Sequence, residues 1–118
     1  MAHPQIAAFA RLANGGQVPE RAVFGQASHL SRSVHDIRYV EKYDEFVVAN
    51  NLAGAIMTFR GGADGQEGPI RVIQGSNSPG GANRLDVDPI HDEIFVPDGN
   101  RIRVYPRMAN GNVAPIRI

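Results

Sequence analysis

The chain has 118 residues and a mass of 12.8 kDa, enough for one domain. Its 12 Lys and Arg residues balance its 12 Asp and Glu residues, which argues against nucleic acid or an anionic membrane as a partner. Without cysteine it has no disulfide framework, thiolate metal site or thiol nucleophile. No apolar run reaches membrane-spanning length and the first residues do not resemble a secretion signal, so we expect a soluble chain, of unknown compartment.

Three segments of the chain, residues 6–22, 56–72 and 102–118, align with one another without gaps. Five alignment columns are identical in all three copies, and an aromatic column supports the same register. These columns are Ile6/Ile56/Ile102, Ala13/Ala63/Ala109, Gly15/Gly65/Gly111, Pro19/Pro69/Pro115 and Arg21/Arg71/Arg117, with Phe9/Phe59/Tyr105 as the aromatic one. The chain is therefore built from an internal repeat.

A second pair of matching segments, residues 35–48 and 85–96, lies between these copies. In the most regular copy the pattern predicts four strands, at residues 84–88, 93–96, 101–105 and 115–118, because apolar and polar residues alternate and β-branched residues are frequent. Asp98-Gly99 and Asn110-Gly111 supply turns between these strands. The 13 Gly and 8 Pro also favour short strands over long helices, so the predicted class is all-β.

Residues 83–105 resemble the NHL-type repeat of β-propellers. The resemblance rests on Leu85-Asp86-Val87-Asp88-Pro89, on Glu93-Ile94-Phe95-Val96-Pro97-Asp98, and on Asn100-Arg101 before an apolar strand. It implies propeller blades of four antiparallel strands, with residues 1–118 forming one domain of about two and a half blades. The half-blade would span residues 6–24, and the two blades residues 34–74 and 84–118.

A closed propeller needs about four to eight blades. We therefore expect the ring to be completed by self-association, with a trimer favoured over a dimer. The alternative is that the chain is a piece of a longer propeller protein and has no activity of its own.

The candidate ligand-binding residues lie on the inner strands, which surround the axis of a propeller. They are His35, Arg38, Arg84, Asp86 and Asp88. Side chains from several subunits could meet at the axis and hold an anion, a metal or a polar ligand. Hydrogen bonds between blades, or an ordinary polar channel, are the alternative for the same residues.

Other residues that could carry chemistry have simpler interpretations. Asp44-Glu45 and Asp92-Glu93 recur in both blades and are interpreted as turns, since neighbouring strand residues point to opposite faces. Arg21, Arg71 and Arg117 are expected on the outer strands, in solvent or paired with carboxylates. His3, His29, His35 and His91 lack zinc-motif spacing, no Ser has a nucleophile context, and the Gly-rich residues 61–65 and 79–83 do not lead into a helix.

The sequence thus predicts no catalytic residue, metal or cofactor. The predicted function is a non-catalytic module that binds or scaffolds, with itself as the expected partner and a peptide or glycan as a further candidate. The alternative is a hydrolase- or lyase-type enzyme whose site lies over the ring axis and is shared between chains.

Overall fold

The computed structural model describes residues 4–32, 34–78 and 81–118. These residues form an all-β fold of nine strands in three small antiparallel sheets, with two single-turn 3-10 helices, Gln26–Ser28 and Glu41–Tyr43. Among them, no helix has the length and apolar character that crossing a membrane requires. The predicted all-β class is confirmed.

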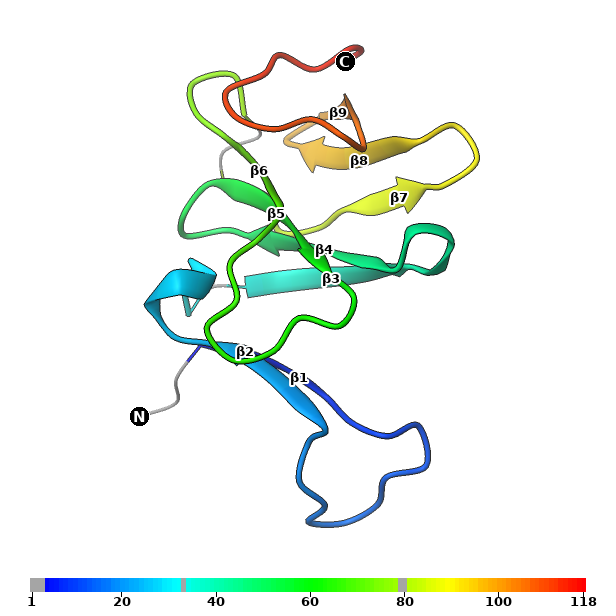
Figure 1. Cartoon of the computed structure of the whole chain (residues 1–118). Coiled ribbons are helices and arrows are strands. Elements are labelled where there is room, and N and C mark those ends of the chain that lie inside the picture. The colour runs from blue at the N-terminus through cyan, green and yellow to red at the C-terminus, as the bar shows by residue number, and fades with distance from the viewer. Residues whose placement is uncertain (1–3, 33, 79–80) are drawn as a thin grey trace.

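The three sheets follow one another along the chain and are stacked face to face (Figure 1). The N-terminal sheet pairs β1 (Gln5–Ala8) with β2 (Arg21–Phe24). The central sheet is a meander of β3 (Val34–Val40), β4 (Glu45–Asn50), β5 (Ala55–Arg60) and β6 (Arg71–Gln74). The C-terminal sheet contains β7 (Asp86–Asp88), β8 (Glu93–Asp98) and β9 (Arg101–Pro106).

The predicted strand at residues 115–118 is reduced to one antiparallel bridge between Arg117 and Val104. Val104 N–H donates to the Arg117 carbonyl at 3.0 Å, and Ile116 N–H donates to the Val104 carbonyl at 2.8 Å. In the repeat, Ile118 aligns with Val72 of β6.

The hydrophobic core has two layers, one on each face of the central sheet. Phe46, Val48, Met57 and Phe59 form a cluster with Val23 of the N-terminal sheet. The opposite face packs against the C-terminal sheet through a second cluster, which includes Val47, Ala49, Ile56, Ile73, Leu85, Ile94, Val96 and Tyr105. Because both faces are covered, β4 is buried at all six positions.

The two Asp-Glu pairs lie where the sequence predicted turns. Asp44 precedes β4 and Asp92 precedes β8, and both adopt the left-handed conformation, with φ of 50° and 62°. Aspartate tolerates this backbone better than most residues.

Candidate functional site

The same backbone contact joins each sheet to the next one. In the loop after β5, Gly65 N–H donates to the Ala22 carbonyl at 2.7 Å, which forms a parallel bridge with β2. In the loop after β9, Gly111 N–H donates to the Val72 carbonyl at 2.6 Å, which forms the equivalent bridge with β6. We call this contact the latch.

The residue before each latch glycine strengthens the contact. Asp64 Oδ1 accepts a hydrogen bond from Ala22 N–H at 3.0 Å, and Asn110 Oδ1 accepts one from Val72 N–H at 2.9 Å. The latch glycines have positive φ, which suits glycine. The repeated Asn/Asp-Gly pair therefore joins neighbouring sheets. In the Gly-rich residues 61–65, this is the role of Asp64-Gly65.

Asn14-Gly15 is the third copy of this pair, and within the described residues it forms no such bridge. Gly15 has φ of 67°, close to the 63° of Gly65, and both residues of the pair are exposed. The N-terminal sheet thus presents a latch in the conformation that the other two copies use.

A buried charged cluster also ties the C-terminal sheet to the central one. Arg107 donates to Glu45 Oε2 at 2.9 Å and to Asp92 Oδ1 at 2.5 Å, and its guanidinium lies 3.5 Å from the centre of the Tyr43 ring. Arg71 donates to the same oxygen of Glu45 at 2.5 Å. Burial opposes the charge on Arg107, but the bonds to Asp92 and Glu45 outweigh it and raise its pKa. Glu45 and Asp92 therefore serve as ion-pair partners in this cluster.

The two ends of the stack expose residues whose repeat equivalents are buried. In the aromatic column, Phe59 and Tyr105 are 0% exposed, whereas Phe9 is 54% exposed. In the isoleucine column, Ile56 is 1% exposed, whereas Ile102 is 53% exposed. The difference follows from position, since none of the described sheets covers Phe9 on one end of the stack or Ile102 on the other.

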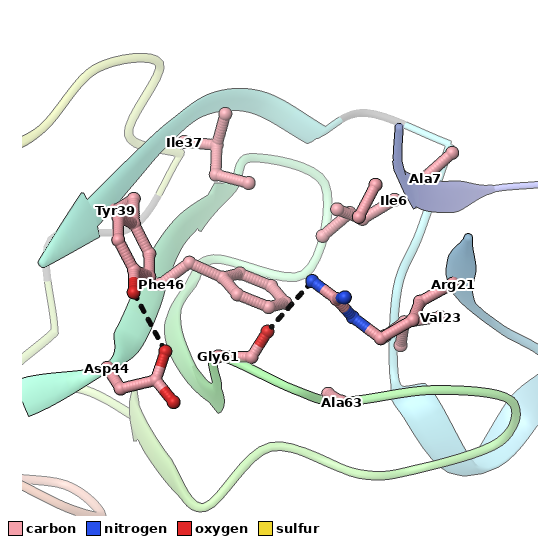
Figure 2. A pocket seen from close by; sticks show the side chains of 11 residues that line it. Ile6, Ala7, Arg21, Val23, Ile37, Tyr39, Asp44, Phe46, Gly61 and Ala63 are labelled. Carbon is pink, nitrogen blue, oxygen red and sulfur yellow. Dashed lines mark hydrogen bonds between the residues drawn. The ribbon is translucent and has the colours of Figure 1, made fainter. Parts of the chain in front are cut away.

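A groove of about 250 Å³ separates the N-terminal sheet from the inner half of the central sheet (Figure 2). The N-terminal sheet has only two strands, so the face of β3 and β4 that carries Ile37, Tyr39 and Phe46 is left partly uncovered. Ile6 and Ala8 of β1 line the opposite side. The groove is mainly apolar and borders the free edge of β1.

Three polar side chains, Tyr39, Asp44 and Arg21, line this groove. Tyr39 donates its hydroxyl to Asp44 Oδ1 at 2.8 Å, and this bond raises the pKa of Tyr39. Arg21 donates to the Gly61 carbonyl at 3.5 Å (Figure 2). Its Nη1 also lies 3.9 Å from Oε2 of the preceding residue, Glu20.

Arg21 differs in its partners from the other two members of its column. Arg71 pairs with Glu45 on β4, and Arg117 pairs with Glu93 on β8 through two bonds of 2.6 and 2.9 Å. The predicted pairing of this column with carboxylates is confirmed at these two positions. Arg21 has no such partner because its sheet lacks the strand that would carry the glutamate.

The structure brings three of the five predicted ligand-binding residues together. Arg38, Arg84 and Asp86 line a second groove, of about 310 Å³, next to Phe95 and Ile102. Arg38 lies 3.7 Å from Asp86 and donates to Asp36 at 2.8 Å. Asp36 in turn accepts a hydrogen bond from Leu85 N–H at 3.1 Å. These bonds link β3 to the start of β7. They agree with the alternative interpretation of these residues, in which they form hydrogen bonds between neighbouring sheets.

The other two predicted residues lie elsewhere. Asp88 Oδ2 lies 2.6 Å from His91 Nδ1, and Asp88 Oδ1 accepts a hydrogen bond from Ile90 N–H. These bonds, above all the one with His91, lower the pKa of Asp88. His35 is exposed on β3. A ligand role for the five residues stays a prediction.

The remaining candidates do not form a reactive arrangement. Within the described ranges, no three His, Asp or Glu side chains gather as metal ligands would. Ser78 donates to the Gly75 carbonyl at 2.7 Å. His3, Ser33 and the Pro79-Gly80 part of the second Gly-rich segment lie outside the described residues.

Sequence reasoning missed Arg107 and Tyr43, which form the buried cluster. A signal was present, since Arg107 aligns with Arg11, but Gly61 interrupts that column in the middle copy. Among the described residues Arg11 has no ion pair, and it is exposed.

No protein-family model, curated protein or solved structure matches the chain.

Proposed function

We propose that this chain is a β-propeller module of the NHL-like kind whose ring is completed by other copies of the same chain, and that it serves as a non-catalytic binding or scaffolding unit. The three sheets are then a half-blade and two blades. The exposure of Phe9 and Ile102, whose equivalents are buried between sheets, is the observation that carries the proposal. Apolar surfaces of this kind mark interfaces.

The two exposed ends are complementary because the repeat already joins such surfaces within the chain. Phe9 lies on the face equivalent to the one through which Tyr105 contacts the central sheet. Ile102 lies on the face equivalent to the one through which Ile56 receives that contact. The copies therefore associate head to tail, which closes a ring when the rotation per chain permits.

The charged and hydrogen-bonding groups of the internal joint also have counterparts at the ends. Arg11 corresponds to Arg107 and Glu93 to Glu45, so Arg11 of one copy meets Glu93 of the next. Asn14-Gly15 corresponds to Asn110-Gly111, and its latch strand is the segment that ends at Ile118. Three chains supply six full blades, which we favour over the four of a dimer. His35, Arg38, Arg84, Asp86 and Asp88 of the several chains then surround the axis.

The first test is the absolute mass in solution, measured by light scattering behind a sizing column. We expect about three times 12.8 kDa, with about twice that mass as the dimeric alternative. A monomer at all accessible concentrations overturns the proposed self-association.

The second test exchanges the charges that meet between copies. Arg11→Glu alone and Glu93→Arg alone place like charges opposite each other, so each should lower the mass toward the monomer. Combining both changes in one chain restores an opposite pair at every junction, whatever the number of copies, and should restore the assembly. Arg32→Glu is the matched control, since Arg32 is exposed and has no ion pair among the described residues. An oligomer that is indifferent to both reversals would show that the copies meet through another surface.

A further inference from the structure

The free edge of β1 is the starting point, because its repeat equivalents are not free. β5 pairs with β4 on one side and β6 on the other, and β9 pairs with β8 and forms the bridge to Arg117. Among the residues that the structure describes, β1 pairs only with β2. Its other side carries backbone groups that an added strand can pair with.

The register of the central sheet specifies how a strand would pair with β1. In the pairing of β4 with β5, Val47 lies opposite Thr58 and Ala49 opposite Ile56. Thr58 and Ile56 correspond to Ala8 and Ile6 of β1. An antiparallel strand on β1 therefore places the counterparts of Val47 and Ala49 beside Ala8 and Ile6, facing the central sheet.

The floor of the groove suits apolar side chains at those two positions. At the joint with the C-terminal sheet, Val47 and Ala49 pack in one cluster with Ile94 and Val96. The counterparts of Ile94 and Val96 are Phe46 and Val48, which lie on the groove side of the central sheet. Ile37 is 44% exposed and Tyr39 60% exposed on the same side, so the floor has apolar surface left to cover.

Arg21 specifies the charge of the added strand. In both other sheets the arginine of this column binds a glutamate: Arg71 binds Glu45, and Arg117 binds Glu93. Each glutamate lies two residues before the first of the two apolar positions, which is Val47 in the central sheet and Phe95 in the C-terminal sheet. Arg21 lines the groove without that partner. A glutamate at the equivalent place on an added strand would pair with it.

We infer that the groove between β1 and β3–β4 is a binding site for an extended peptide that adds a strand to β1 and carries the pattern Glu-x-apolar-x-apolar. The glutamate pairs with Arg21, and the apolar residues cover Ile37 and Tyr39. This inference names the ligand of the binding unit, and so rests on the proposed function, but it uses a different surface from the one that joins copies.

The probe for this site is an end-blocked synthetic peptide with the sequence of residues 91–98, His-Asp-Glu-Ile-Phe-Val-Pro-Asp. It carries the pattern, and its proline limits self-association of the peptide. Binding is followed by isothermal titration and by backbone amide shifts of the protein. We expect saturable binding, with shifts concentrated in β1 and in residues 37–46.

The control is a charge exchange between peptide and protein. Replacing the peptide's glutamate by lysine, or Arg21→Glu in the protein, should weaken binding about tenfold, and the two changes together should recover most of it. Arg32→Glu should leave binding unchanged. No saturable binding, or binding that ignores both reversals, overturns the inference.

Combining these results with the mass separates the two proposals. An oligomer that does not bind the peptide contradicts only the peptide site, and a monomer that binds it contradicts only self-association. If the peptide binds but dissociates the oligomer, the groove is occupied by a neighbouring copy and the peptide site is wrong.

Discussion

The two joints of this molecule use the same latch but differ in how much surface they cover. In the joint between the N-terminal and central sheets, here the half joint, the N-terminal sheet contributes only β1 and β2, the equivalents of the outer strands β5 and β6. The joint between the central and C-terminal sheets, here the full joint, also includes the inner strands β7 and β8. At the half joint Val23 is fully covered while Ile37 and Tyr39 remain exposed. The latch and outer strands thus hold a sheet in place, and the inner strands supply the rest of the buried surface.

The charged cluster is the second difference between the joints. Arg107 connects Glu45 and Asp92 across the full joint. At the half joint its place is taken by Gly61, where an added Cβ would clash with Asp44 Oδ1. A side chain does not fit there without displacing Asp44, so the cluster is specific to one joint.

The largest expected effect comes from breaking the cluster at the full joint. Glu45→Gln removes the carboxylate that Arg71 and Arg107 share, which leaves the buried Arg71 without its ion-pair partner and Arg107 with Asp92 alone, and should lower the free energy of unfolding by about 3–5 kcal/mol. Glu93→Gln is the matched change at the exposed end and should have a much smaller effect, because Arg117 is largely in solvent. Urea denaturation of both variants measures the difference. Equal losses would show that the full joint does not depend on this cluster.

Apolar truncation should separate the covered and uncovered ends in the same way. Ile56→Ala creates a cavity in the full joint and should cost about 2–5 kcal/mol of unfolding free energy. Ile102→Ala, at the same repeat position, should cost less than about 1 kcal/mol in the unassociated chain. Thermal unfolding at low protein concentration provides this comparison. A loss at Ile102 that grows with protein concentration would instead report its burial between copies.

The latch should show equal effects at the two joints. Gly65→Ala and Gly111→Ala each force alanine into a positive φ and should each cost about 1–2 kcal/mol, since no neighbouring atom lies within 4 Å of the added carbon. Gly16→Ala, next to the third copy but without positive φ or close neighbours, is the control. Unequal losses at Gly65 and Gly111 in urea denaturation would contradict the view that the two joints share one latch.

Much of this fold could be predicted from the sequence because equivalent residues in the copies of the repeat make equivalent contacts. The Asn/Asp-Gly and arginine columns mark the latch and the outer ion pairs, and alternation marks the strands. Arg107 could not be assigned, because its partner Glu45 lies 62 positions away in another sheet and a single glycine interrupts its column. The groove at Tyr39 was also hidden, since it depends on strands that one sheet lacks rather than on any motif.

The smallest effect concerns pH and the exposed end of the stack. Hydrogen bonds from Arg117 lower the pKa of Glu93, against the opposing effect of partial burial. The folded state therefore binds this proton less readily than the unfolded state. The resulting stabilisation is complete above the ordinary glutamate pKa of about 4.3 and is lost as the pH falls through the lowered value. Glu93→Gln should thus be less stable than the parent at pH 7, and this difference in stability should shrink in acid. Glu41→Gln is the control, because Glu41 is exposed and has no ion pair among the described residues. A gap in urea midpoint that stays constant between pH 7 and about 3 would mean that Glu93 acts through packing alone.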